Sequence, residues 1–503
     1  MCSNGCTVWI YENKHVDNRS FYNYVFLKRT HHICCKHLFW LTYVMGVNSS
    51  KKLAAKCSFL SKDEQHIVSS SFRLASRNSE KIKEEELTKL WGCQMDSRLL
   101  QYINNYLFGI GEMRTNTVEL ERFAELFVFC TRGTVDEKLK VLIISLGRSD
   151  SESNDIPYIL VKEYVESIVA SYMKIQKLSN TKQFKTWFSR GCFTSAQNIQ
   201  RLAESLTHDL AAADSITRRA LEVWLQGSTV LGQLLLFVFM HLYNISHKDK
   251  SQVALEKTSD EAHCSTEREK DRSLVPFCRG LDLIPSYPSL LDLNQIVFIN
   301  ANLPQQYQLE WRFLFSSEIH GESFSTLIGR IVNQGPSVLV VEDRNGYMFG
   351  GFAPANWALG PNFFGDDSSF LFTLAPRMRI FPSTGYNQHF QYLNLHQQTM
   401  PNGLAMGGQH GYCGLWIDSE YGTGHSSESC TTYSGYQQMS YSKDFNFRHL
   451  EVWGLGAPPL TPQEKGERVM SGTSILDSNT ENKAMLKMAG RTIHSEGIRE
   501  PSN

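Results

Sequence analysis

Six side chains that could carry out acid–base, nucleophilic or metal chemistry lie close together in one glycine-rich stretch. They are His410, Cys413, Asp418, His425, Ser426 and Cys430. A cysteine beside a histidine can form a nucleophile pair, and the same residue types can bind zinc. The stretch has no Gly-x-Ser-x-Gly nucleophile elbow and no His-Glu-x-x-His or paired Cys-x-x-Cys motif. Small polar residues beside glycine turns commonly satisfy backbone groups, so we expect structural packing, with no catalytic residue, metal or cofactor.

The glycines around these side chains indicate how the chain must run to position them. The run from Gly403 to Trp416 has five glycines within its first twelve residues, and each would cost a helix about 1 kcal/mol. Glycine also allows positive φ and a close approach to neighbouring strands. The run ends in an alternating segment, Gly414-Leu415-Trp416-Ile417-Asp418. We therefore expect a tight turn that leads into a central strand of a β-rich domain.

The composition is that of an ordinary globular protein. The 503 residues suggest two or three domains, and the hydrophobic content of 42% is well above that of disordered chains. A formal net charge of -1 gives no overall field that would attract nucleic acid. Twelve cysteines without regular spacing, and no secretory signal ahead of them, favour a reduced cytosolic compartment over a disulfide framework.

Residues 59–245 are expected to be helical. Ser61 and Glu64 fit a capping box at the first helix. The longest apolar run, 230–245, is interrupted by polar residues and is shorter than the roughly 20 residues of a membrane-spanning helix, so we interpret it as a buried helix. Apolar periodicity predicts further helices at 118–130, 136–146, 161–177, 198–213 and 215–226.

The first helices have the spacing of an EF-hand calcium site but not its ligands. If Ala75 is loop position 1, Ile82 falls at position 8 and Glu86 at position 12. Ligand positions 1, 3 and 5 and the glycine position 6 are occupied by Ala75, Arg77, Ser79 and Glu80. We expect an EF-hand-like helix pair without metal, with a calcium-responsive adaptor as the alternative. A second, weaker remnant is predicted at Ile159, Glu163 and Tyr164.

Residues 246–287 are expected to be a linker, because most of them are charged or hydroxyl-bearing and large apolar residues are rare. Beyond it the apolar period changes to two, which predicts an antiparallel-rich β domain over 288–457. Asn345-Gly346 is a two-residue hairpin signal. Strands are expected at 296–299, 309–315, 337–343, 347–353, 370–374, 378–381, 414–418 and 449–454.

The N-terminal residues carry a candidate membrane attachment. Residues 1–44 form an atypical extension, and residues 45–58 begin with Met45-Gly46-Val47-Asn48-Ser49-Ser50, an N-myristoylation pattern. The pattern works only if translation starts at Met45; a chance match is the other interpretation. Nearby lysines would add an electrostatic hold on an anionic membrane, so we expect lipidation of Gly46. The metal-ligand types in the extension match no zinc spacing; they are His31, His32, Cys34, Cys35 and His37.

The tail, 458–503, is expected to contain one amphipathic helix over 478–490. Ser478 and Glu481 fit a capping box at its start. An isolated helix of this length is marginal in water, so its apolar face needs a groove on this protein or on a partner. The expected partner-binding residues are Met485, Leu486 and Met488.

The C-terminal domain resembles a TLDc domain, and the order and spacing of its matching segments are together specific. The segments are Trp311, Phe315-Ser316-Ser317, His320-Gly321-Glu322-Ser323-Phe324, Gly350-Gly351-Phe352, Gly407-Gly408, Gly414-Leu415-Trp416-Ile417-Asp418, Gly424-His425-Ser426, Cys430 and Glu451-Val452-Trp453. The resemblance covers about a third of the chain. With the helical half, the pattern at Gly46 and the tail helix, it extends to the mTOR-associated, lysosome-directed members of that family. It implies an α+β protein whose TLDc domain is a two-sheet β-sandwich flanked by helices.

The resemblance also implies a function. It implies a non-enzymatic adaptor in the cytoplasm and on the cytoplasmic face of the lysosomal membrane. Such a protein would support mTOR signalling, with mTOR pathway proteins and subunits of the vacuolar proton pump (V-ATPase) as partners. The TLDc domain and the tail helix would dock on the pump. Two alternatives stay open: an enzyme-like TLDc protein that protects against oxidative stress, centred on Cys413 or His425, and the calcium-responsive adaptor.

Overall fold

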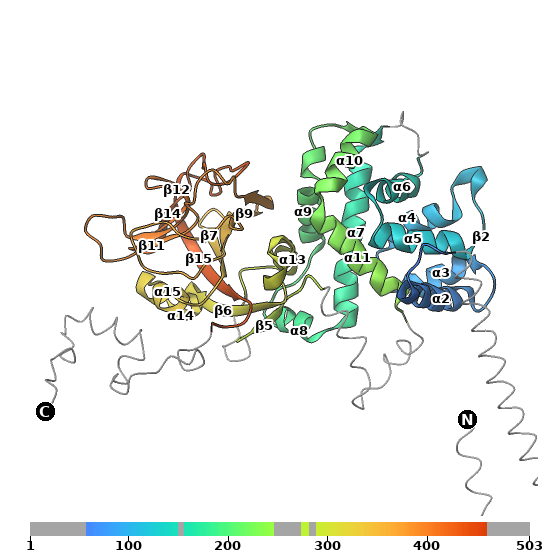
Figure 1. Cartoon of the computed structure of the whole chain (residues 1–503), viewed down its shortest axis with the longest axis horizontal. Coiled ribbons are helices and arrows are strands. Elements are labelled where there is room, and N and C mark those ends of the chain that lie inside the picture. Colours follow the sequence, from blue (N-terminus) through green and yellow to red (C-terminus); the bar gives the residue numbers. More distant parts are fainter. Residues whose placement is uncertain (1–56, 149–154, 246–272, 281–287, 460–503) are drawn as a thin grey trace, which may run out of the picture.

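The computed structural model describes residues 57–148, 155–245, 273–280 and 288–459 (Figure 1), and all structural statements concern those residues. A helical part, which ends at residue 245, lies beside a β-rich part. The chain that follows residue 273 first passes between the two parts and then enters the β-rich part. Gly46, the N-terminal extension and the tail with Met485, Leu486 and Met488 lie outside the described residues, as does most of the expected linker.

The helical part is built from helix–loop–helix units in which a two-residue strand precedes each second helix. The first pair of units comprises α2 (Lys62–Ser76), β1 (Ile82–Lys83), α3 (Glu84–Trp91), α4 (Ser97–Phe108), β2 (Thr117–Val118) and α5 (Leu120–Thr131). The second pair comprises α6 (Val135–Ser145), β3 (Ile156–Pro157), α7 (Tyr158–Ser179), α9 (Ala196–Leu206), β4 (Ser215–Ile216) and α10 (Arg218–Gly227). β1 pairs with β2 and β3 with β4, so short strands join the loops two by two.

The predicted helices are confirmed, with shifts of a few residues at most of their ends; the exception is the helix predicted at 198–213, which ends at Leu206 and is followed by a 3-10 turn at His208–Leu210. The capping box exists as expected: Glu64 N–H donates to Ser61 Oγ over 3.3 Å, and Ser61 N–H donates to Glu64 Oε2 over 2.8 Å. The apolar run is α11 (Thr229–Tyr243), which packs against α5 and α7 and is buried along one side. In the described part of the chain no single helix is long and apolar enough to cross a membrane; α10 and α11 pass that test only as a pair bent by 82°.

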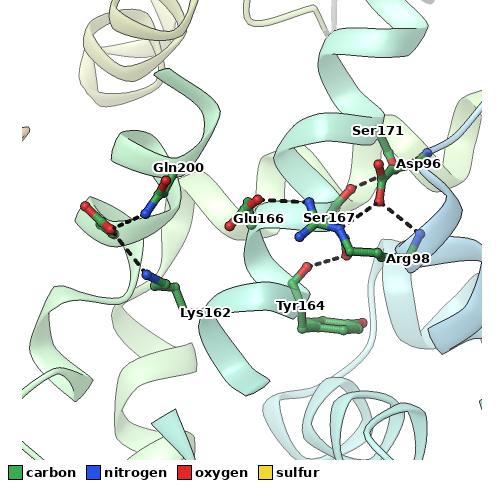
Figure 2. A network of polar contacts seen from close by, with 9 residues as sticks. Asp96, Arg98, Lys162, Tyr164, Glu166, Ser167, Ser171 and Gln200 are labelled. Carbon is green, nitrogen blue, oxygen red and sulfur yellow. Dashed lines mark hydrogen bonds and ion pairs between the residues drawn. The ribbon is translucent and has the colours of Figure 1, made fainter. Parts of the chain in front are cut away.

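Helix α7 lies at the centre of the helical part, and polar contacts connect it to a neighbouring helix on each side (Figure 2). On one side Arg98 of α4 pairs with Glu166 over 2.9 Å. The N–H of Asp96, the residue that caps α4, donates to the buried Ser171 hydroxyl over 2.9 Å. On the other side Lys162 pairs with Glu204 of α9 over 3.2 Å. The contacts therefore hold the first pair of units and the second pair on one central helix.

The β-rich part is a single sheet folded into two layers. One layer has the order β10–β9–β8–β7–β15–β6–β5 and the other the order β11–β12–β13–β14–β15, all antiparallel except the β5–β6 pair. The strands are β5 (Phe277–Arg279), β6 (Glu310–Ser316), β7 (Ser337–Asp343), β8 (Met348–Ala353), β9 (Phe370–Ala375), β10 (Arg379–Pro382), β11 (Tyr392–Asn394), β12 (Gly403–Gln409), β13 (Tyr412–Asp418), β14 (Thr423–His425) and β15 (Asp444–Leu455).

Strand β15 belongs to both layers. Its first residues pair with β14, and its later residues lie between β7 and β6. The layers touch across an apolar core: a Cβ on Gly351 of β8 would lie 2.6 Å from the sulfur of Met406 on β12. The helices α13 (Leu293–Asn302) and α15 (Phe324–Ile331) flank the sheet. The expected β-sandwich with flanking helices is therefore confirmed.

The prediction of a strand at 296–299 is wrong, because these residues form the middle of α13. Asp292 caps the helix and accepts hydrogen bonds from the N–H groups of Asn294 (2.7 Å) and Gln295 (3.0 Å). The helix lies between the helical part and the sheet, and all four apolar residues are buried. A short run that is buried on every side has no polar face, so periodicity cannot distinguish helix from strand.

Three fully buried tryptophans join the helical part to the sheet. Trp187 of α8 (Lys182–Phe188) lies with its ring centroid 5.9 Å from that of Trp311 and 5.0 Å from that of Trp453. Their indole N–H groups donate, over 2.9, 2.9 and 3.1 Å, to the Pro276 carbonyl, the Asn300 side-chain oxygen and a Glu451 carboxylate oxygen. One hydrophobic cluster runs from α2 to β15 through this junction, so the two parts share a core.

A second, polar contact between the two parts lies at the β9–β10 turn. Ser205 of α9 donates to the carbonyl of Met378 over 2.5 Å, and the Arg379 guanidinium lies 2.6 Å from Nε2 of His208. Burial, and the charge of Arg379 after it, lower the pKa of His208. A neutral His208 can accept the hydrogen bond from Arg379 through Nε2, so the neutral imidazole fits this contact.

Candidate functional site

The glycine-rich run forms the β12–β13 hairpin, and β13 lies between β12 and β14 as an inner strand. Gly407 and Gly408 have φ of 76° and 80°. A Cβ on Gly408 would lie 2.1 Å from the carbonyl oxygen of Tyr412 on the opposite strand. Both expected uses of glycine, positive φ and close approach, are therefore confirmed at this position.

Four of the six candidate side chains converge on one pocket. The pocket has a volume of about 440 Å³ and opens on the outer face of the β13–β14–β15 layer. Its walls include His410, Cys413, Asp418 and His425. Cys413 and Trp416, three positions apart, both line it, although an odd spacing in a regular strand would place them on opposite faces. The irregular backbone at Gly407 and Gly408, opposite Cys413, accompanies this change of face.

The other two candidates lie elsewhere. The Ser426 side chain is fully buried, shares a 2.8 Å hydrogen bond with the Tyr436 hydroxyl and accepts another from the Met439 N–H. Cys430 packs beneath the hairpin, where a Cβ on Gly407 would lie 2.9 Å from its sulfur. Both residues hold the loop after β14 in place, as structural packing predicts.

A hydroxyl–imidazole–carboxylate row was not predicted from the sequence. Nδ1 of His425 lies 2.7 Å from Asp444 Oδ1, and Nε2 lies 3.0 Å from Ser427 Oγ. The row has the order of a nucleophilic triad. Ser427, however, is buried and does not line the pocket, and its N–H donates to the Cys413 carbonyl. The Asp444 side chain is 86% exposed. The arrangement fixes the position of His425, and the hydroxyl of this row does not face the pocket.

Cys413 is the thiol that does face the pocket. Burial raises its pKa to about 12, so at neutral pH the group is a protonated thiol and not a thiolate. Its sulfur lies 3.2 Å from the carbonyl oxygen of Gln409, to which the S–H donates. Reactive cysteines need a lowered pKa, and here the environment acts in the opposite direction. Cys413 therefore behaves as an apolar wall of the pocket.

His410 lies in a cluster of rings beside the pocket. Its ring centroid is 4.8 Å from that of Tyr392 and 5.4 Å from that of Phe363. Burial, and the charge of nearby His389 after it, lower the pKa of His410. His389, which the sequence did not single out, donates to the Gly408 carbonyl over 2.6 Å. Over the residues that the structure describes, no group of three or more His, Cys, Asp or Glu side chains could hold a metal ion.

The EF-hand-like loops carry arginines at or near the ligand positions. Ile82 at position 8 pairs with Val118, and in the other pair Ile156 pairs with Ile216. Four residues beyond each of these, the position that needs a bidentate glutamate holds Glu86, Arg122, Leu160 and Ala220. The remnant predicted at Ile159, Glu163 and Tyr164 is therefore shifted by three residues from the structural one. Comparison of the Ile82–Glu86 spacing with Val118–Arg122 could have located the second loop.

In each of the first two loops an arginine takes part in the interactions at position 12. Arg77, at position 3, pairs with Glu86, at position 12, over 2.5 Å. In the second loop Arg122 donates from Nε to the Tyr106 carbonyl over 3.0 Å and lies over the Tyr106 ring at 4.8 Å. A positive side chain thus stands among the residues that would otherwise bind the cation.

We expect the stability of the full chain to be independent of calcium. A ligand raises the midpoint of thermal unfolding only if it binds the folded state, and the first two loops, where Arg77 and Arg122 stand at ligand positions, offer it too few oxygens. Thermal unfolding is to be compared in excess Ca²⁺ and in a calcium chelator, with Mg²⁺ as the control for ionic effects. A midpoint that rises with Ca²⁺ and not with Mg²⁺ would contradict the expectation and favour a calcium-responsive adaptor.

The β-rich part also matches a known domain. The family model of the TLDc domain matches residues 284–456. Nuclear receptor coactivator 7 of Homo sapiens is 29% identical over 194 residues, which are 38% of this chain and 19% of that protein. Similarity to this coactivator is therefore limited to one part of each chain.

Other relatives match along most of the chain. MTOR-associated protein MEAK7 of Gallus gallus is 36% identical over 423 residues, covering 81% of this chain and 84% of that protein. The Homo sapiens protein of the same name is 33% identical over 408 residues, covering 78% and 83%. Because these matches span more than two thirds of both chains, the protein belongs to the family of MTOR-associated MEAK7 proteins.

Proposed function

We propose that this protein is a non-enzymatic adaptor in mTOR signalling. The name of its relatives, which associates them with mTOR, supports this. The chemistry of the pocket supports it independently, because burial raises the pKa of the Cys413 thiol in the pocket wall and the Ser427 hydroxyl beside His425 is buried. The alternative, an enzyme centred on these residues, predicts that a Cys413→Ala, His425→Ala double variant loses its cellular function. Full retention of mTOR signalling by that variant would end the alternative.

We further propose that the adaptor works at the cytoplasmic face of the lysosomal membrane and docks on the vacuolar proton pump. The proposed contacts are the TLDc domain and the tail residues Met485, Leu486 and Met488. The sandwich supports the tail by fixing where it begins: Arg312 donates to the Gly456 carbonyl over 3.0 Å and to the Gln334 carbonyl over 2.5 Å. The tail thus starts from a rigid point beside β6 and β15, and its methionines suit an adaptable apolar contact.

The proposal is tested by recovering pump subunits and mTOR with tagged full-length protein from cell extracts. A triple variant, Met485→Ala, Leu486→Ala and Met488→Ala, is expected to recover at least about tenfold less pump, because three buried apolar side chains contribute more than 1.4 kcal/mol. The matched control, Lys483→Ala with Lys487→Ala, changes the opposite face of the same predicted helix. Equal recovery by the triple variant and the wild type would remove the tail from the proposal.

Lipidation of Gly46 is the proposed means of reaching the membrane. Mass spectrometry of the mature N-terminus in cells tests it directly, since an acyl group on Gly46 requires that residue to be the first. One acyl chain binds membranes only marginally, so the basic residues after it would supply the second hold. A mature chain that begins ahead of Gly46 would refute this route while leaving docking on the pump intact.

A further inference from the structure

The pocket on the outer face of the β13–β14–β15 layer is lined by two rows of side chains that run across the strands. In one row Trp416 of β13 lies opposite His425 of β14, which lies opposite Asp444 of β15. In the next row Thr423 lies opposite Asn446, and Asp418 ends β13 beside them. All six line the pocket of about 440 Å³. Inner strands of a sheet hold such positions rigidly, so the pocket is preformed.

The pocket is acidic, and its carboxylates have acceptor capacity left. Asp444 uses Oδ1 toward His425, and Asp418 uses Oδ1 to accept the Glu420 N–H over 2.9 Å. The second oxygen of each has no hydrogen bond within the described part of the chain. None of the residues lining the pocket is lysine or arginine. Lys443, the basic residue beside it in sequence, lies over the Tyr412 ring at 5.8 Å.

An aromatic surface stands beside these carboxylates. Trp416 is half-buried, and its ring stacks on that of Tyr392 with centroids 6.2 Å apart. The stacking holds the indole in one orientation while part of it lines the pocket. Trp is the aromatic side chain that attracts cations most strongly through its face. Two carboxylates and an indole together favour a planar cation over an anion or a neutral group.

We propose that this pocket binds the guanidinium group of an arginine presented by a basic segment of a protein partner. Arginine offers a planar fork of N–H donors that matches carboxylates bidentately and stacks on aromatic rings, whereas the lysine ammonium is a strongly hydrated point charge. The volume lies at the lower end of the range for small-ligand sites, which suits one long side chain. The inference goes beyond the proposed function, since it concerns the chemistry of a partner segment and holds whether or not that partner is the pump.

The test uses calorimetry of the full-length protein with a short capped peptide that carries one arginine among glycines and serines. The matched probe has citrulline, a neutral isostere, in place of arginine. The arginine peptide is expected to bind at least about tenfold more tightly than the citrulline peptide, because only the former makes charge-assisted hydrogen bonds. Added salt is expected to weaken the binding of the arginine peptide and to leave the binding of the citrulline peptide unchanged. A lysine peptide that binds as tightly as the arginine peptide would refute guanidinium recognition.

Variants locate the binding on the protein. Asp418→Asn is expected to lower the affinity for the arginine peptide at least about tenfold. Asp367→Asn is the control, because it removes the same charge from an exposed turn outside the pocket and is expected to bind as the wild type does. Unchanged thermal unfolding of Asp418→Asn would show that the loss of binding does not come from misfolding. If Asp418→Asn does unfold at a lower temperature, Trp416→Phe serves as the second pocket variant. Wild-type affinity in both pocket variants, or no binding of the arginine peptide at all, would overturn the proposal.

Discussion

Replacing Trp453 by alanine is expected to lower the free energy of unfolding by about 3–5 kcal/mol. The indole is fully buried where the helical part meets the sheet, 5.0 Å from the Trp187 ring and 5.1 Å from the Phe313 ring. Its removal leaves a cavity at the centre of a core that both parts share. It also takes one of several donors from Glu451, a carboxylate that is only 2% exposed, and the loss of one hydrogen bond at a buried acceptor adds to the destabilisation.

Equilibrium unfolding in urea measures this loss, and two further variants apportion it. Trp453→Phe keeps most of the apolar volume and removes the N–H, so about 1–2 kcal/mol is expected. Trp416→Ala removes the same side chain from a half-buried site on the outer face, where partial burial predicts a smaller loss. Equal losses for Trp453→Ala and Trp416→Ala would mean that the two parts do not share a core. Hydrogen exchange in Trp453→Ala is expected to rise in α8 as well as in β15.

Local rules explain what could be predicted from the sequence. The capping box of Ser61 and Glu64 and the hairpin at Asn345-Gly346 each depend on residues no more than a few positions apart. The capping box is present. The hairpin is present too, but the Asp343 N–H donates to the Tyr347 carbonyl over 2.9 Å, so the loop has three residues rather than the predicted two, with Gly346 at φ of 79°. The resemblance to the TLDc family supplied the sandwich, which no local rule contains.

Contacts between residues that are distant in the sequence explain what could not be predicted from it. The partner of His425 is Asp444, nineteen positions later and brought opposite it only by the pairing of β14 with β15. The residues at 296–299 are helical because tertiary structure surrounds them on all sides, and their sequence carries no mark of that. The pocket could be predicted only in part. Four of the six candidate residues line it and Ser426 and Cys430 do not, and the acidic character that Asp418 and Asp444 give it appears only when the strands are aligned.

The second large effect concerns Gly408 and Gly411, two glycines that the sequence alone does not distinguish. Gly408→Ala is expected to destabilise the protein by about 3–5 kcal/mol, near the upper end for single substitutions. A Cβ there would lie 2.1 Å from the Tyr412 carbonyl oxygen. The shift it forces would also disturb two bonds of Gly408, from its N–H to the Thr432 hydroxyl (2.8 Å) and from His389 to its carbonyl (2.6 Å).

Gly411→Ala is the matched control for this substitution, because its φ of 82° equals that of Gly408 within 2° while no atom lies within 4 Å of the added Cβ. It is expected to cost only the backbone strain of a left-handed residue, about 1–2 kcal/mol. The difference between the two variants in urea unfolding therefore isolates the close approach of β12 to β13 from positive φ. Equal destabilisation would mean that the hairpin relaxes freely around the new methyl group. In that case positive φ alone would account for the glycines, and the rigidity attributed to the pocket beside them would be lost.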